Sequence, residues 1–135
     1  TYKVKANGRW LPEVKNLADY AGNIGQKITD IAIKVDKGSV KYRVRTNGRW
    51  LPYVTGYNTS DYNNGYAGNG TPIDCVEVYY YTPDDIRPYQ QAYYRVSPVN
   101  KGYYSWQKDN STADGMDGYA GAPGVAIDRF QIQIK

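Results

Sequence analysis

The side chains best suited to recognition in this sequence are aromatic. The chain of 135 residues has 16 Tyr and 3 Trp, against one Phe and one Met. An aromatic ring offers a flat apolar face, and Tyr adds a polar tip, so both suit surfaces that are partly wet and partly dry. Sugar rings carry flat C–H faces that pack on Trp and Tyr, while their hydroxyls need amide or carboxylate partners. The composition therefore favours carbohydrate recognition.

Two aromatic positions recur in a shared motif, and the second offers the better recognition residues. The first position holds Trp10, Trp50 and Tyr103, and the next one holds Tyr53 and Trp106. The regular first position fits a core or an inter-repeat contact, so we expect Trp10 and Trp50 to be structural. We predict that Tyr53 and Trp106, which are out of phase with it, bind the ligand.

Two inserted loops, Gly56–Gly65 and Asp109–Gly118, are the other candidates. Both are rich in hydroxyl, amide and carboxylate groups. Loops on a rigid scaffold often carry recognition residues, although an ordinary solvated loop has the same composition. The second loop has carboxylates that could bind calcium, but their spacing matches no calcium-binding loop. The predicted ligand-binding residues of the two loops are Tyr57, Asn58, Asp61, Tyr62, Asn64, Asp114 and Asp117.

A recurring pair of carboxylates, Asp74 and Asp128, could be taken for the catalytic pair of a glycosidase. Thr29 holds the same position in the first repeat, which fits turn capping and not catalysis. We therefore expect each Asp to cap a turn at the start of its strand, within its own repeat, with the two held far apart. The sequence has no Gly-x-Ser-x-Gly, phosphate-binding loop or Cys/His dyad, and we predict no enzymatic activity.

Composition also limits cofactors and partners. One Cys and no His leave a zinc site without its usual ligands, so we expect no metal and no cofactor. The net charge of +4 is spread along the chain without a basic cluster, so we predict no nucleic-acid binding. No stretch is long and apolar enough to span a membrane. The chain begins at Thr1, and we expect a piece of a larger protein with any targeting signal upstream.

Three degenerate repeats of one unit position these residues. We assign them, within a single domain 1–135, to residues 1–38, 39–90 and 91–135. The first two repeats share the identical run Asn-Gly-Arg-Trp-Leu-Pro, which is too long to be chance. Later in each repeat a Tyr-Ala-Gly triplet begins, at Tyr20, Tyr66 and Tyr119. A segment of alternating apolar residues closes each repeat, the pattern of a half-buried strand.

Strand-forming residues, many Gly and no run of helix formers predict an all-β fold. A unit of about 45 residues cannot bury its apolar face alone, whereas three units can close around a pseudo-threefold axis. We expect a β-trefoil, with a β-prism of one four-stranded sheet per repeat as the alternative. In the connector Thr82–Pro88 we expect one helical turn, with Thr as the N-cap and Pro at the first helical position.

The repeated pattern also resembles a known family. Its Gly-x-Trp, Ala-Gly, Gly and alternating Ile and Val are similar to the clostridial hydrophobic-tryptophan repeats of secreted Firmicute proteins. Tyr42–Tyr81 and Asp117–Phe130 resemble more closely the C-terminal repeat regions of clostridial and clostridial-phage peptidoglycan hydrolases. The resemblance covers essentially the whole chain and implies a wall-associated accessory role beside a covalently linked catalytic domain. It implies no fixed binding residues.

These observations predict a non-catalytic module that binds a bacterial cell-wall glycan such as peptidoglycan. Its expected location is extracellular, at the cell wall, in a secreted or phage-released lytic enzyme. The alternative is a protein-interaction or structural module that joins subunits or packs on an adjacent catalytic domain. The first repeat has only Lys15–Asp19 as its loop and Glu13 where the second has Tyr53. We therefore expect the second and third repeats to dominate binding.

Overall fold

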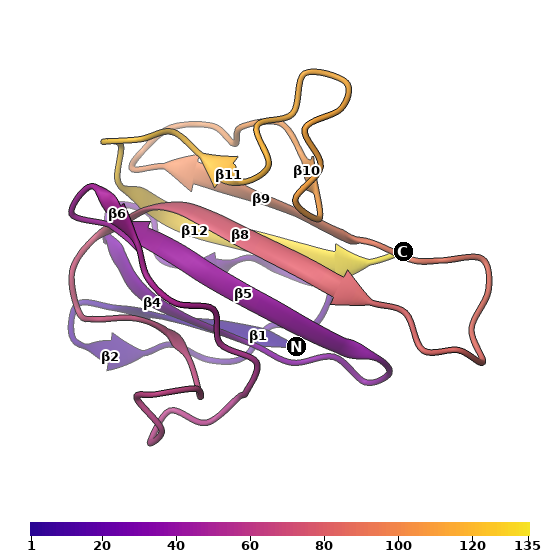
Figure 1. Ribbon diagram of the computed structural model, residues 1–135. Helices are drawn as coiled ribbons and strands as arrows, with labels where there is room; N and C mark the ends of the chain where they lie inside the picture. The colour runs from indigo at the N-terminus through magenta and orange to yellow at the C-terminus, as the bar shows by residue number, and fades with distance from the viewer.

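The computed structural model describes residues 1–135, which form β-strands and their connections (Figure 1). The 12 strands make three four-stranded antiparallel sheets, which confirms the predicted all-β class. The sheets are numbered I, II and III after the repeat that supplies their two long central strands. The chain has no helix long and apolar enough to cross a membrane.

Each sheet has two long central strands between two short edge strands. From edge to edge, sheet I contains β2 (Arg9–Trp10), β1 (Tyr2–Ala6), β4 (Ile28–Ile33) and β7 (Ala67–Gly68). Sheet II contains β6 (Arg49–Trp50), β5 (Ser39–Thr46), β8 (Ile73–Tyr81) and β11 (Ala120–Gly121). Sheet III contains β10 (Gln107–Lys108), β9 (Ala92–Pro98), β12 (Ile127–Ile134) and β3 (Ala21–Gly22).

Each sheet takes its fourth strand from another repeat. Strand β7 of the second repeat pairs with β4 of the first, and β11 of the third pairs with β8 of the second. Strand β3 of the first repeat pairs with β12 of the third, so the exchange runs in a circle. Glycine is required where these short strands meet their neighbours, because a Cβ at Gly22 would clash with the Asp128 carbonyl. No repeat therefore completes its sheet alone.

Alternation along the long strands directs one side of each sheet to a common core. In β5, Val40, Tyr42 and Val44 are buried, while the residues between them are half-exposed. One cluster of 22 buried apolar residues includes members from all three repeats. Its largest fully buried side chains are the Tyr that opens the Tyr-x-Val motif of each repeat, namely Tyr2, Tyr42 and Tyr94, each with 0% exposure.

Every closing strand carries a β-bulge at the same point. The pairing between the opening and closing strands of each sheet skips one residue of the closing strand. The skipped residue is the polar one after the first Ile, namely Thr29, Asp74 and Asp128. A bulge turns a side chain out of the regular alternation. The polar residue of each repeat can therefore sit in a strand without pointing into the apolar core.

The shared Asn-Gly pairs form hairpin turns of two residues. Asn7 and Gly8 have φ angles of 53° and 78°, and Asn47 and Gly48 have 51° and 79°. Two consecutive positive φ values match the type I′ turn, which favours Asn followed by Gly. These turns bring each two-residue strand, β2 or β6, back onto its opening strand.

The helical turn predicted for the connector between the second and third repeats is wrong. Residues 82–88 form no helix, and a hydrogen bond from the Ile86 amide to the Pro83 carbonyl (3.1 Å) closes a simple turn. Thr82 does not cap a helix, because its hydroxyl bonds to the backbone amide and carbonyl of Gln90. These long-range bonds close the connector as a loop and override the local helix-start signal.

Candidate functional site

The outer side of sheet II carries a cation beside two aromatic rings. The guanidinium of Arg43 lies 4.7 Å from the ring centroid of Trp50 and 4.5 Å from that of Tyr53. Arg43 donates two hydrogen bonds to Glu77 (3.1 and 2.9 Å), which also accepts the Tyr53 hydroxyl. Burial and this bond raise the pKa of Tyr53 to about 12. Trp50 meets Tyr119 edge-on at 5.5 Å, and the group Arg43, Trp50, Tyr53 and Tyr119 is named face 2.

Sheet III carries the same arrangement with the two ring types exchanged. The Arg95 guanidinium lies 4.0 Å from the ring centroid of Tyr103 and 4.4 Å from that of Trp106. Arg129 links Tyr20 of the first repeat to this group. Its guanidinium lies 5.9 Å from the ring centroid of Tyr20 and 5.3 Å from that of Tyr103. The group Arg95, Tyr103, Trp106 and Tyr20 is named face 3.

The expected structural role of Trp10 and Trp50 is half right. Neither ring belongs to the apolar core, because both are half-exposed on the outer sides of their sheets. Both make the predicted inter-repeat contact: Trp10 packs edge-on against Tyr66 at 5.4 Å, as Trp50 does against Tyr119. The Tyr of the Tyr-Ala-Gly triplet thus recurs because it packs on the neighbouring repeat.

A pocket of about 560 Å³ brings together three of the residues predicted from the sequence. Trp106 of face 3 and Tyr119 of face 2 both line it, so it lies where sheets II and III meet. Asp114 and Asp117 line the same pocket from the loop that follows β10. The arrangement combines three aromatic rings, because Tyr104 also lines the pocket, with two carboxylates.

The carboxylates of this pocket are available to a ligand. Asp114 and Asp117 are exposed, and neither side chain makes a hydrogen bond or ion pair with the protein. Asp114 and Gly115 have φ angles of 55° and 80°, so a tight turn presents the first of them. An exposed carboxylate without a protein partner is a ready acceptor for hydroxyl groups.

Asp109 anchors the start of this loop and takes no part in the pocket. Its buried carboxylate accepts hydrogen bonds from the Tyr80 amide (3.1 Å) and the Ala92 amide (2.9 Å). Burial raises the pKa of Asp109 despite these bonds. The loop is therefore fastened to two strands at its base while its tip stays open.

The loop of the second repeat uses its polar side chains to hold its own shape. Asn58, Asp61 and Asn64 accept hydrogen bonds from backbone amides within or beside the loop, at 2.8–3.3 Å. Such bonds are typical of turns, and they occupy the groups predicted to bind the ligand. Tyr62 is 63% exposed and meets Tyr66 edge-on at 6.1 Å. These residues lie apart from the pocket that contains Asp114 and Asp117.

The side chain of Tyr57, in the same loop, contacts residues of sheet I and its connections. Its hydroxyl donates a hydrogen bond to Glu13 Oε1 at 2.5 Å. Burial together with this bond raises the pKa of Tyr57, and the same bond lowers the pKa of Glu13. A residue predicted as part of a second-repeat site thus contacts the first repeat.

Asp74 and Asp128 hold turns, as predicted, but chiefly in the following repeat and not in their own. Asp74 Oδ2 accepts the Gly124 amide at 2.7 Å, and Asp128 Oδ2 accepts the Gly25 amide at 2.8 Å. Asp128 also accepts the Asn100 amide of its own repeat (2.9 Å). Burial raises the pKa of Asp128, but its hydrogen bonds outweigh burial and leave it below the ordinary value. The bulge explains why the turns that they hold lie in the following repeat, because it directs each carboxylate toward that repeat.

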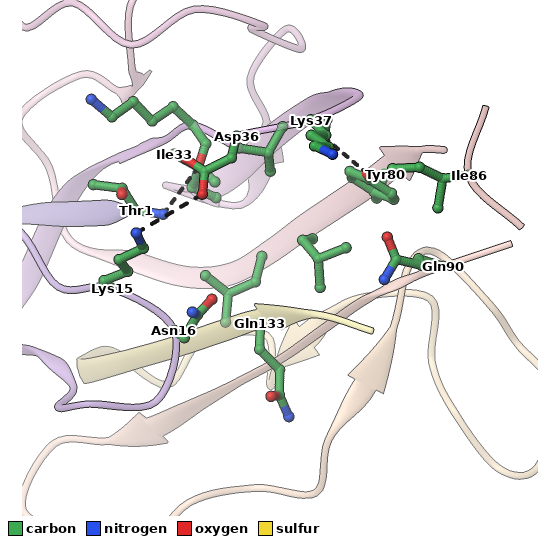
Figure 2. Close-up of a pocket in the computed structure, with 14 residues that line it drawn as sticks. Thr1, Lys15, Asn16, Ile33, Asp36, Lys37, Tyr80, Ile86, Gln90 and Gln133 are labelled. Carbon is green, nitrogen blue, oxygen red and sulfur yellow. Dashed lines mark hydrogen bonds and ion pairs between the residues drawn. The ribbon is translucent and has the colours of Figure 1, made fainter. Parts of the chain in front are cut away.

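Figure 2 shows a second pocket, of about 410 Å³, at the end of the closing strands. Its walls include the apolar side chains of Ile33, Ile132 and Ile134. The Tyr80 hydroxyl donates to the Lys37 carbonyl there, at 2.9 Å. None of the residues predicted to bind the ligand lines this pocket.

Sequence reasoning missed the cation of each face. Each cation directly follows the buried Tyr of its opening strand, so alternation puts Lys3, Arg43 and Arg95 on the outer side of the strand. The recurrence of a cation at this position was the available signal. Its partner on the closing strand differs: Glu77 in sheet II is replaced by the neutral Gln131 in sheet III, which accepts both bonds from Arg95 (3.0 and 2.8 Å).

No family profile, curated protein or solved structure matches this chain. The features of the chain that bear on function are therefore the aromatic faces and the pocket between sheets II and III.

Proposed function

We propose that the chain is a non-catalytic module that binds a bacterial cell-wall glycan at the pocket beside Trp106. One observation carries the proposal: this pocket joins the rings of Trp106 and Tyr119 to the free carboxylates of Asp114 and Asp117. A sugar needs that combination, because its C–H face packs on a ring while its hydroxyls donate to acceptors. Faces 2 and 3 flank the pocket and extend the aromatic surface for a longer chain.

The expected affinity of one site is low. Half-covering one aromatic ring contributes about 2 kcal/mol before entropy costs, and each hydrogen bond to a carboxylate adds about 1–2 kcal/mol. Such a site has a Kd from roughly millimolar to tens of micromolar. Several sites on one rigid domain raise the apparent affinity for a polymer through avidity. A repetitive wall polymer suits this design better than a small soluble sugar.

The sequence resemblance supports peptidoglycan as the polymer and a lytic enzyme as the parent protein. In that setting the module acts outside the cell, secreted or released by phage lysis, and holds a covalently linked catalytic domain near its substrate. For the fold, we favour a β-prism with a pseudo-threefold axis over a trefoil. One four-stranded sheet per repeat and the circular strand exchange support that choice.

Pull-down with purified Gram-positive sacculi tests the function. The chain should sediment with sacculi, and Trp106→Ala should weaken that binding. Tyr89→Ala is a matched control, because Tyr89 is 73% exposed with Arg87 over its ring at 4.1 Å, yet lies outside the faces. The proposal fails if the chain stays in the supernatant at low salt, or if the control weakens binding as much as Trp106→Ala.

The alternative, a protein-interaction or structural module, would use the apolar pocket of Figure 2. It predicts self-association or affinity for an adjacent catalytic domain, which size-exclusion chromatography with light scattering measures. Ile86 lines that pocket, which no residue of face 2 or face 3 lines. Ile86→Ser should leave sacculus binding unchanged, whereas lost binding would move the functional surface to this pocket.

A further inference from the structure

We infer that sheet I carries a third binding face, face 1, formed by Lys3, Trp10, Tyr66 and a ring borrowed from the second repeat, Tyr57. The inference rests on the proposed glycan binding and deepens it, because it makes the module trivalent. It also reverses the expectation that the first repeat, which lacks its own second aromatic residue, binds weakly.

The cation of face 1 is placed as in the other two faces. Lys3 Nζ lies 5.8 Å from the ring centroid of Trp10 and 5.0 Å from that of Tyr57. Arg43 and Arg95 hold the corresponding place between a first and a second aromatic ring. In face 1 the first ring comes from the same repeat as the cation, and the second ring comes from another repeat.

The second ring is fixed in faces 1 and 2 by the same chemistry. In face 2 the Tyr53 hydroxyl donates to a carboxylate, that of Glu77. In face 1 the Tyr57 hydroxyl donates to the carboxylate of Glu13, which occupies the sequence position of Tyr53. The carboxylate of face 1 therefore occupies the position that the ring holds in face 2, whereas the position of Glu77 is taken by Ala32, opposite Lys3. The ring of face 1 comes instead from the inserted loop, and the hydrogen bond between ring and carboxylate is kept. A second cation, Lys34, lies over Tyr57 at 4.8 Å.

The backbone on both sides of Tyr57 is held in place. The Gly56 amide donates to the Asn64 carbonyl (2.9 Å), and the Asn58 amide donates to the Gly65 carbonyl (2.9 Å). The Gly56 carbonyl accepts the buried Tyr42 hydroxyl at 2.6 Å. The hydrogen bonds at the base of the inserted loop thus fix the position of the Tyr57 ring against sheet I. This contact gives the longer loop of the second repeat a role in the face of the first.

The three Trp residues give each face its own reporter. Trp10 belongs to face 1, Trp50 to face 2 and Trp106 to face 3, and the sequence contains no other Trp. Their indole N–H groups give separate signals in a ¹H–¹⁵N NMR spectrum. A titration with a soluble GlcNAc–MurNAc disaccharide therefore shows which faces bind.

We expect all three indole signals to shift and saturate in the unmodified chain. Tyr57→Ala should abolish the shift at Trp10 and leave those at Trp50 and Trp106, which also shows that the variant is folded. Tyr57→Phe keeps the ring and should retain the Trp10 shift, with affinity reduced no more than a few fold. The inference is overturned if Trp10 stays unmoved while the other two shift, or if Tyr57→Ala leaves its shift intact. If no signal moves, the proposed glycan binding fails and the inference fails with it.

Discussion

The hydroxyl of Tyr42, at the start of the second repeat, accepts a hydrogen bond from the backbone amide of Ile33 in the first (3.2 Å). The same hydroxyl donates to the Gly56 carbonyl at the base of its own inserted loop (2.6 Å). Tyr94 makes the equivalent pair of bonds: its hydroxyl accepts the Val78 amide of the second repeat and donates to the Asp109 carbonyl at the base of the third-repeat loop. A buried hydroxyl therefore joins two repeats and anchors the inserted loop at its base.

Tyr42→Phe should lower the free energy of unfolding by about 1–3 kcal/mol, because it leaves a buried amide and carbonyl without their partner. Urea denaturation measures the change. Tyr89→Phe is the control, since the Tyr89 hydroxyl is exposed and bonds to no protein group, and it should change nothing. Equal losses in the two variants would contradict a joining role for the Tyr42 hydroxyl.

Trp50→Ala should cost far less stability than a core substitution. Trp50 is half-exposed and contacts Tyr119 and Arg43, so its loss should cost about 1–2 kcal/mol. Tyr42→Ala, at 0% exposure, should cost about 3–5 kcal/mol. Thermal melts of the two variants provide the comparison. A loss at Trp50 as large as that at Tyr42 would place Trp50 energetically in the core.

Local pattern was enough to predict the all-β class and the long closing strands. The alternation of Phe130 and Ile132 with polar residues predicts a half-buried strand, and the structure has one there. The exchange of β3, β7 and β11 could not be found in this way. Each is two residues long, too short for any periodicity, and its partner lies in another repeat.

The candidate site was predictable only in part, for the same reason. Trp106, Asp114 and Asp117 come from one stretch of the chain, so reasoning within a repeat found them together. Tyr57 is assigned from the sequence to a second-repeat site because it is close in sequence to the other residues of that repeat. Its contact with sheet I depends on where the loop lies in space, which sequence proximity does not reveal. The sequence pattern predicts the wrong turn for Asp74, which accepts the Gly124 amide of the third repeat, because a bulge changes the direction of a side chain without changing the pattern.

Asp128 should make the stability depend on pH in acid. Burial raises its pKa, but the bonds from Gly25, Asn100 and Arg129 and the charge of Arg129 together outweigh burial, so the folded pKa lies below the ordinary 3.8. Ionised Asp128 therefore stabilises the fold above that ordinary value, and this contribution is lost as the pH falls through the lower folded pKa. Asp109, whose pKa burial raises, contributes with the opposite sign, so a variant is needed to isolate Asp128.

Asp128→Asn provides that comparison. The difference in free energy of unfolding between the unmodified chain and the variant should be present at about pH 7 and should shrink below about pH 4. Urea denaturation across this range measures it. A difference that stays constant down to strongly acidic pH would show that the carboxylate gains nothing from being ionised in the fold.

Tyr57→Phe should raise the pKa of Glu13. The hydrogen bond from the Tyr57 hydroxyl favours the ionised carboxylate and holds its pKa below the ordinary 4.5. Removing the hydroxyl should bring the pKa back toward that value, which a carbon-detected NMR titration of the Glu13 carboxyl follows. Tyr53→Phe, which removes a hydroxyl from sheet II, should leave Glu13 unchanged. If Tyr57→Phe also leaves the Glu13 pKa unchanged, the hydrogen bond is absent in solution.

The two free carboxylates of the pocket should distinguish a neutral glycan from an anionic wall polymer. If Asp114 and Asp117 accept hydroxyl hydrogen bonds, Asp117→Ala should weaken binding of a neutral disaccharide of two GlcNAc residues by about 1–2 kcal/mol, roughly fivefold to thirtyfold. Asp117→Asn keeps an acceptor and should weaken it less.

An anionic ligand such as teichoic acid gives the opposite sign. It would be repelled by both carboxylates and attracted by the cations of the faces, so Asp117→Asn should tighten its binding. Added salt should weaken binding of the polyanion and leave the neutral disaccharide nearly unaffected, because salt screens charge and not ring packing. Calorimetric titration of both ligands at two salt concentrations provides the measurement. Tighter sacculus binding by Asp117→Asn, with strong salt dependence, would therefore assign the pocket to an anionic wall polymer and reject hydroxyl recognition by its carboxylates.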